Sequence, residues 1–175
     1  MDNLHPVHQT DDGLFNTITG TKISIHNPTV DMINVNDISH GLSRICRFGG
    51  HVNQHYSVAQ HSLLVALIGP PRLMRVAILH DAAEAYIGDV IKPLKNILGT
   101  AYTDIEDRFE KVIFEKFSVN IELLPDVKPY DKIALEIEHN YFFKNECYQF
   151  ELIFDHVWDY KLSRENYWNA INTLF

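Results

Sequence analysis

The sequence predicts a compact all-α domain with a short extended segment at its N-terminal end. Apolar residues recur at spacings of three and four along most of the chain, and glycine and proline interrupt these stretches at short intervals. The alternation typical of strands is confined to the first part of the chain. We see no internal repeat, low-complexity tract or linker. We therefore expect a single domain over 1–175, with an N-terminal arm over about 1–35, a helical core over about 36–145 and a C-terminal helical segment over about 146–175.

The arm has two parts. Residues 1–13 are polar and are expected to be loosely held. Residues 16–25 alternate β-branched and polar side chains around Thr19-Gly20, which predicts a short hairpin or an extended arm.

The first predicted helices are marked by their caps. Asn36-Asp37 is expected to begin a helix whose apolar face is spaced by four and three, at Ile38, Leu42 and Ile45. Gly49-Gly50 then opens a loop. Ser57 is expected to cap a helix over 58–68, which ends at the turn Gly69-Pro70-Pro71. Because this turn is short, the next helix is expected to lie antiparallel to it.

The remaining helices follow the same signals. A helix is predicted over about 72–86, with Pro71 near its start and Gly88 beyond its end. Thr103 is expected to cap a helix over 104–117, whose apolar stripe comprises Ile105, Phe109, Val112, Ile113 and Phe117. Pro125 and Pro129 are interpreted as bracketing a turn before a helix over 131–143, on which Ile133, Ala134 and Ile137 share a face. A last helix is expected over 163–175.

Composition narrows the function classes. Hydrophobic residues make up 46% of the chain and charged residues 22%, as in ordinary folded proteins. The formal net charge of −8 argues against a nucleic-acid polymer as partner. The first residues lack the basic and apolar regions of a signal peptide, and no apolar run is long enough to span a membrane, so we expect a cytosolic protein. Cys46 and Cys147 form no CxxC motif and are interpreted as two buried free thiols, with a single disulfide as the alternative.

The most informative motif is the pair His80-Asp81, within a segment that runs from Leu79 to Asp89. The pair supplies a neutral nitrogen and an anionic oxygen, which suit a divalent ion such as Mn²⁺, Co²⁺, Fe²⁺ or Zn²⁺. The preceding residues are apolar, so the pair is expected at the edge of a core, where polar groups need partners. A metal ion is one such partner.

Two further residues complete a ligand set. His61 lies on the helix before the pair, and Asp131 begins a helix some fifty residues after it. Two histidines and two carboxylates leave positions open on a five- or six-coordinate ion, as a catalytic site requires for water and substrate. Glu84 and Asp89 follow the pair closely, and either carboxylate could orient or deprotonate the water or protonate a leaving oxygen.

Cations for an anionic substrate are also present. Arg47 and Lys95 lie on the segments that flank the predicted site, and arginine can bind a phosphate bidentately. His51 and His55, in the loop after Gly50, are interpreted as hydrogen-bonding residues outside the metal shell.

Each candidate also has a purely structural interpretation. Glu84 would be a solvated helix residue, Asp89 a cap after Gly88, Asp131 a residue favoured by the helix dipole, and Arg47 an ordinary ion pair.

These residues carry a resemblance to a known family. His61, His80-Asp81 and Asp131 match the H…HD…D signature of the HD-domain metal-dependent phosphohydrolases. The segments Arg47-Phe-Gly-Gly-His51, Tyr56-Ser-Val-Ala-Gln-His61 and Gly88-Asp89 resemble its small bacterial and phage branch, which includes 5′-deoxynucleotidases and phage dATP triphosphohydrolases.

The resemblance implies roles for these residues. His61, His80, Asp81 and Asp131 would be metal ligands, for Zn, Co, Mn, Fe or Mg. Glu84 would activate water and Asp89 would act near the leaving group or sugar. Arg47 would contact phosphate or nucleotide. Phe48 stands where many members have a tryptophan beside the base or sugar, and Pro93 falls near the nucleobase wall.

The expected function is therefore the hydrolysis of a small deoxyribonucleotide in a bacterial cytosol, with a phage-encoded origin equally compatible. A dATP-like triphosphate, giving deoxynucleoside and triphosphate, is favoured by the compact chain; a 5′-deoxynucleotidase is the first alternative. A cyclic-nucleotide phosphodiesterase is disfavoured because no GYP-like extension accompanies the pair. A non-catalytic nucleotide-binding module is disfavoured because the expected ligands are all present. The resemblance also implies a homo-oligomer, either a dimer or a hexamer.

Overall fold

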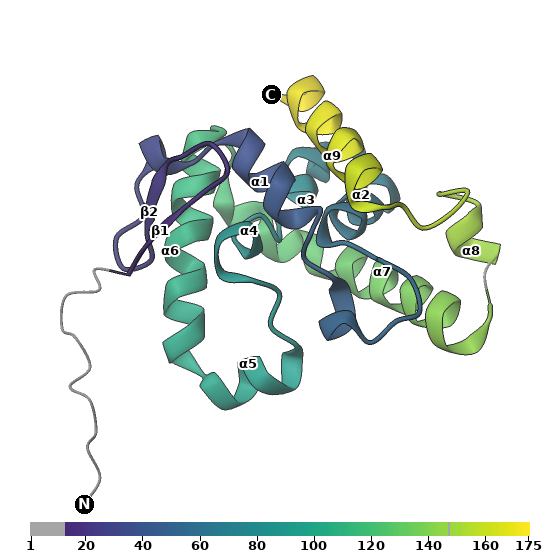
Figure 1. Ribbon diagram of the computed structural model, residues 1–175. Coiled ribbons are helices and arrows are strands. Elements are labelled where there is room, and N and C mark those ends of the chain that lie inside the picture. The colour runs from purple at the N-terminus through teal and green to yellow at the C-terminus, as the bar shows by residue number, and fades with distance from the viewer. Residues whose placement is uncertain (1–12, 147) are drawn as a thin grey trace, which may run out of the picture.

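The protein is all-α apart from one small N-terminal hairpin, as predicted. The computed structural model describes residues 13–146 and 148–175. Residues 1–12 of the predicted loose segment and Cys147 therefore lie outside the described residues. Helices α2 and α3 lie in the middle of the molecule, with α6 on one side, α7 below them and α9 above them (Figure 1).

The predicted hairpin is present. Strands β1 (Leu14–Asn16) and β2 (Lys22–Ser24) pair antiparallel, with Phe15 opposite Ile23. The turn between them is tied to the core because Thr19 donates its backbone N–H and its hydroxyl to the Asp37 carboxylate, at 3.0 and 2.7 Å. The side chain of Ile23 on β2 is fully buried in the core, which holds the hairpin against the helices.

Helix α1 (Val35–Leu42) starts slightly earlier and ends earlier than predicted. Its cap is Asn34, whose side chain accepts a hydrogen bond from Asn36 N–H, so the prediction of Asn36-Asp37 as the cap was wrong by two residues. Ile38 and Leu42 are buried as expected, whereas Ile45 follows in the next turn and is only partly buried.

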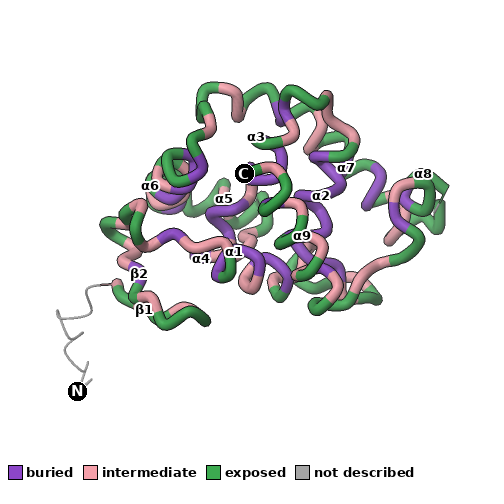
Figure 2. The backbone as a smooth tube through the Cα atoms, turned by 90° about the horizontal axis from the view of Figure 1, so that it is seen from above, coloured by how far each residue is buried: buried purple, intermediate pink, exposed green. Residues whose placement is uncertain are grey.

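Helix α2 (Val58–Ile68) is the centre of the core, and both of its predicted bounds are confirmed. The Ser57 hydroxyl accepts from the Gln60 N–H and caps it. Every residue from Val58 to Ala66 is buried, so α2 is covered on all sides. The buried stretches in Figure 2 gather around it.

The single helix predicted over 72–86 is wrong: the chain forms α3 (Met74–Leu79), a tight turn and α4 (Glu84–Ile87). The His80 imidazole donates through Nδ1 to the Ala77 carbonyl at 2.7 Å, which occupies an acceptor of the last helical turn. The backbone then tightens, since Ala82 N–H bonds Leu79 and Glu84 N–H bonds Asp81, three residues back. Gly88, with φ of 82°, ends α4 as predicted.

Helices α5 (Lys92–Leu98) and α6 (Thr100–Lys116) are separated by one residue, Gly99. Helix α5 was not predicted, although Pro93 in its first turn and Gly99 at its end are typical helix signals. Thr103 lies inside α6, so its prediction as a cap was wrong; the helix begins at Thr100, four residues before the predicted start. The predicted apolar stripe does face the core, with Phe109 and Ile113 fully buried.

Helix α7 (Leu124–Lys144) contains both prolines that were interpreted as bracketing a turn. Pro125 lies in the first turn, where backbone N–H groups have no helical partner, so it costs little. Pro129 has no backbone N–H, so one helical hydrogen bond near the same end of α7 is not formed. Ile133 is 46% exposed and does not share the buried face, which instead carries Val127, Ala134, Ile137 and Glu138.

The C-terminal segment contains α8 (Tyr148–Glu151) and α9 (Tyr160–Leu174). Helix α9 starts three residues before the predicted position because Asp159 caps it, accepting from the N–H groups of Lys161 and Leu162. Tyr167 is buried on its inner face, and its hydroxyl donates to the Ile78 carbonyl on α3 at 2.8 Å.

The buried apolar residues form one cluster that extends from Ile23 to Ile171. Among the described residues, no helix is both long and apolar enough to cross a membrane.

Candidate metal centre

The first histidine of the centre is positioned by a helix cap. His61 lies one turn into α2, and its N–H bonds the Ser57 carbonyl. Its imidazole is fully buried. Nδ1 lies 2.5 Å from Oε1 of Glu138 on α7. A proton held on Nδ1 by this carboxylate leaves Nε2, the other ring nitrogen, as the lone-pair donor to a metal.

The second histidine is oriented by a different contact, which likewise leaves its Nε2 free to bind a metal. His80 follows α3, and its Nδ1–H is directed to the Ala77 carbonyl. Its Nε2 is therefore also a lone-pair donor. The rings of His61 and His80 lie 5.3 Å apart between centroids, so both free nitrogens face one small region.

Two carboxylates face the same region. Asp131 Oδ1 lies 3.2 Å from His61 Nε2 and 4.0 Å from His80 Nε2. Asp81 Oδ2 lies 3.4 and 3.2 Å from the same two nitrogens. His61, His80 and Asp131 each offer a ligand atom within 4.8 Å of the others, so these three could hold a metal ion, with Asp81 beside them.

The donor set is suited to an ion of this kind. Ligand atoms about 2.1 Å from one ion are about 3.0 Å apart at right angles and about 4.2 Å apart when opposite, and the four nitrogen–oxygen distances fall in this range. Both Nε2 atoms are buried, and neither has a hydrogen-bond partner with good geometry among the described residues. Such atoms are costly unless something binds them.

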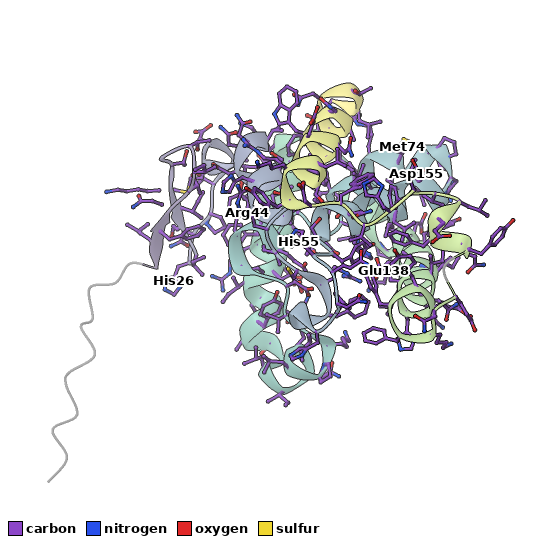
Figure 3. All side chains as sticks on the ribbon, turned by 45° about the vertical axis from the view of Figure 1, so that its right-hand side comes forward. His26, Arg44, His55, Met74, Glu138 and Asp155 are labelled. Carbon is purple, nitrogen blue, oxygen red and sulfur yellow. The ribbon has the colours of Figure 1, made fainter. Side chains whose placement is uncertain are left out.

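Glu138 is a central residue that the sequence interpretation missed. It is fully buried, and it accepts from the Tyr56 hydroxyl at 2.7 Å and from Arg47 Nη2 at 3.1 Å, as well as contacting His61. Figure 3 labels it on α7. The available signal was its spacing: Glu138 stands seven residues after Asp131, two helical turns further along the same face.

The positive and negative side chains of the centre stabilise one another's charged forms. Burial disfavours the Asp81 carboxylate, but His80, His61 and Arg47 outweigh burial and lower its pKa. Burial and Arg47 lower the pKa of His61, yet Glu138 and Asp131 raise it to about 9 overall. An ion that binds Nε2 must therefore displace a proton that this anionic environment favours.

Glu84 is buried, 3% exposed, so its interpretation as a solvated helix residue is excluded. Oε1 accepts from Lys95 Nζ at 3.4 Å, whereas Oε2 is buried without a hydrogen-bond partner among the described residues. Burial, followed by the charges of Asp81 and Asp89, raises the pKa of Glu84 well above its usual range. Burial also raises the pKa of the half-buried Asp89.

The predicted cations differ in their surroundings. Arg47 Nη1 lies 3.8 Å from Asp81 and its Nη2 pairs with Glu138, so Arg47 links Asp81 to the carboxylate that contacts His61. Lys95 lies on α5 and also pairs with Glu106 at 2.8 Å. Both cations are thus next to the centre, and both are already paired with carboxylates.

The remaining predicted residues lie further out. Phe48, in a left-handed conformation with φ of 57°, packs edge-on against Phe142 and Phe143 and lies beside Arg47. Pro93 lies in the first turn of α5 and is exposed.

The loop histidine His55 is confirmed as a hydrogen-bonding residue. Its Nε2 lies 3.0 Å from the Ser43 carbonyl, and its Nδ1 lies 3.3 Å from Sγ of the half-buried free Cys46. His51 is exposed.

Two glutamates on α6 were also missed. Glu106 binds Lys95, and Glu110 is close enough to Asp81 and His80 to interact with their charges. Burial, then Glu106 and Asp107, raise the pKa of Glu110 to about 7. Their spacing of four on an amphipathic helix was the signal for a shared face.

Comparison with known proteins finds two bacterial relatives, both uncharacterized. It is 42% identical over 108 residues to the uncharacterized protein YfdR of Escherichia coli, an alignment that covers 62% of this chain and 60% of that protein. It is 34% identical over 126 residues to the uncharacterized protein RCAP_rcc00048 of Rhodobacter capsulatus, covering 67% and 64% of the two chains. The chain thus aligns with less than two thirds of each relative's length. No model of a known protein family matches the sequence.

Proposed function

We propose that the protein is a metal-dependent phosphohydrolase of deoxyribonucleotides, of the HD-domain class, with a dATP-like triphosphate as substrate. The observation that carries this proposal is the convergence of two buried histidine Nε2 atoms and two aspartates, with the buried carboxylate of Glu84 close by. The H…HD…D signature of the sequence supports the same class.

His61, His80, Asp81 and Asp131 would hold a divalent ion. Mixed nitrogen and oxygen donors suit Mn²⁺, Co²⁺, Fe²⁺ or Zn²⁺ better than Mg²⁺, which prefers oxygen alone. When bound, such an ion supplies a Lewis acid that acidifies water and polarises a phosphoryl oxygen.

Glu84 is proposed to take the proton of the attacking water on Oε2, the oxygen that Lys95 does not bind. A raised pKa brings a carboxylate nearer to the working range of a general base. Water then adds its oxygen to the α-phosphorus, and the bond from phosphorus to the 5′-oxygen of the sugar breaks. Asp89, whose pKa is also raised, is proposed to return a proton to that oxygen, which gives deoxynucleoside and triphosphate.

A 5′-deoxynucleotidase is the second candidate, and one observation favours it. Arg47 and Lys95 are both paired with carboxylates, which leaves less positive charge for a triphosphate than the sequence suggested. The same attack on a 5′-monophosphate would release inorganic phosphate.

Product analysis tests both candidates. Each dNTP and dNMP is incubated with the chelator-treated protein and with Mn²⁺, Co²⁺, Fe²⁺, Zn²⁺ or Mg²⁺ in turn. Triphosphate and deoxynucleoside from dATP are the expected products, whereas phosphate from monophosphates alone would select the second candidate. His80→Ala should abolish turnover, and His139→Ala, which changes an exposed histidine on α7, should not. Absence of turnover with every metal and nucleotide would contradict the proposal.

A further inference from the structure

A groove on the outer surface between α1 and α9 has features of a second ligand site. Its cavity measures about 340 Å³, within the usual range for small-molecule sites. The lining residues are Asn36, Arg44, Tyr160, Lys161, Arg164, Glu165 and Trp168. None of them belongs to the metal centre or to the residues around it.

The walls of the groove come from two helices. From the start of α9, Tyr160, Arg164 and Trp168 are spaced by four, so they share one face. The facing wall is formed by Asn36 on α1 and by Arg44 just after it.

Two contacts connect these walls. Trp168 Nε1 donates to Asn36 Oδ1 at 3.1 Å, and the Arg44 guanidinium lies 4.7 Å from the Tyr160 ring centroid. The groove is therefore built by specific contacts between its two walls.

The groove is rich in unpaired positive charge. The ion pairs that arginine and lysine form within 13–146 and 148–175 involve Arg47, Arg72 and Lys95. Arg44, Lys161 and Arg164 take part in none of them, although the chain carries a net charge of −8.

Two carboxylates lie near these cations. Asp159 is turned to the first N–H groups of α9 as its cap. Glu165 is the acidic residue of the lining. Three cations against one lining carboxylate make the groove suited to an anion.

Two aromatic side chains add a surface for a planar ring. Trp168 and Tyr160 are each 41% exposed, although both are large apolar groups. The hydrogen bond to Asn36 fixes the plane of the Trp168 indole, and Arg44 covers part of the Tyr160 ring. Nucleobases stack on such rings, and Tyr and Trp beside arginine are typical of sites that bind phosphate and base together.

We propose that this groove binds a nucleotide, with its base on Trp168 and its phosphates held by Arg44, Lys161 and Arg164. Figure 3 shows where Arg44 lies, at the end of α1 and beside the start of α9. This site is separate from the metal centre and does not rest on the activity proposed there.

Calorimetric titration with ATP tests the proposal. The full chain is titrated in EDTA, which removes divalent ions and with them any binding that needs the metal centre. One equivalent of ATP is expected to bind. The double variant Lys161→Gln, Arg164→Gln should weaken binding by about tenfold or more, and Trp168→Ala by a similar factor. The control Lys111→Gln, Lys116→Gln removes two exposed cations from α6 and should bind ATP like the wild type.

Two partial ligands test each half of the site. Adenosine and tripolyphosphate are each expected to bind at least about tenfold more weakly than ATP. Equal affinity for adenosine, or equal affinity for tripolyphosphate, would overturn the assignment of base and phosphates. So would ATP binding that is unchanged in the Lys161→Gln, Arg164→Gln variant.

A last measurement keeps the two proposals apart. Deoxynucleotide hydrolysis by Lys161→Gln, Arg164→Gln under metal-replete conditions, at saturating substrate, is expected to match that of the wild type. If no hydrolysis is found in either protein but ATP still binds in EDTA, the groove stands and the proposed activity falls. If ATP binding in EDTA is lost in Asp131→Asn and kept in the groove variant, the metal centre is the binding site and the groove proposal falls.

Discussion

His61 on α2 and Glu138 on α7 are joined across the core, 77 residues apart in sequence, by a hydrogen bond between Nδ1 and Oε1. This contact decides which nitrogen of His61 faces the metal centre. Glu138 also accepts hydrogen bonds from Tyr56 and Arg47. It therefore holds these two residues beside the centre without being one of the proposed metal ligands. Mutation of a carboxylate that binds a metal ligand, rather than the metal, typically changes metal affinity by roughly 10–100-fold.

Glu138→Gln should therefore weaken metal binding by about 10- to 100-fold while the fold is retained, because the amide keeps the size of the carboxylate but loses its charge. Competition with a chromophoric chelator measures this change. Glu136→Gln alters an exposed residue on the same helix and should leave the affinity unchanged. Equal affinities of the two variants would show that Glu138 does not position His61.

Removal of metal should lower the stability of the protein, because an ion that binds the folded centre shifts the unfolding equilibrium. At a metal concentration of about 100 times Kd, the free energy of unfolding rises by about 2.7 kcal/mol. Thermal unfolding with and without EDTA measures this effect. In His80→Ala the two curves should coincide, since one buried Nε2 donor is gone. A persistent EDTA effect in that variant would indicate a metal site elsewhere.

Glu84→Gln should lower turnover by about 10²- to 10⁴-fold, the usual contribution of a general base. The amide is isosteric with the carboxylate, and Glu84 is not among the proposed ligands, so bound metal should stay at the wild-type level. The readout is the ratio of turnover to metal content, with Glu115→Gln, an exposed glutamate of α6, as control. A loss of metal in parallel with activity would make Glu84 a ligand instead.

Much of this centre was predictable because its signals are local. The Ser57 cap fixes where α2 begins, and the position of His61 on that helix follows from the cap. The clustering of His61, His80, Asp81 and Asp131 could be predicted because each residue carries chemistry that is rare at the edge of a core.

The remaining features depend on contacts and helix positions that the sequence pattern does not reveal. The turn after α3 forms because the His80 side chain takes the Ala77 carbonyl, a choice that helical propensity does not reveal. Glu138 resembles any helical glutamate until α2 packs against α7. Pro125 and Pro129 predicted a turn, yet Pro125 lies in the first turn of α7, which tolerates it, and Pro129 lies inside the helix at the loss of one hydrogen bond.

Gly41→Ala should destabilise the protein by about 1–3 kcal/mol, although alanine is the better helix former. A β-carbon at this position would lie 2.8 Å from the Ala85 carbonyl oxygen, where α1 packs on α4, and a backbone atom cannot move aside cheaply. Denaturant unfolding measures the change. A more stable variant would mean that α4, which carries Glu84, moves easily relative to α1.

Stability should also depend on pH through Glu110. Its pKa is raised from an ordinary 4.5 to about 7 in the folded protein, chiefly by burial and then by Glu106 and Asp107. The folded state therefore holds this proton more tightly than the unfolded state does. The contribution of Glu110 to the free energy of unfolding therefore falls as pH rises between 4.5 and about 7, and it is lost above that range.

Glu110→Gln, which is neutral at every pH, should escape this loss. In EDTA the variant is expected to match the wild type near pH 4.5 and to exceed its stability by about 1–3 kcal/mol at pH 8, a range reduced for partial solvent screening. Urea unfolding across this pH range gives the difference. Glu115→Gln, on an exposed position of the same helix, should show the wild-type slope. If Glu110→Gln keeps that slope too, the Glu110 carboxylate is ionised in the folded protein already at pH 5, and the negative charges around it are better screened than their burial implies.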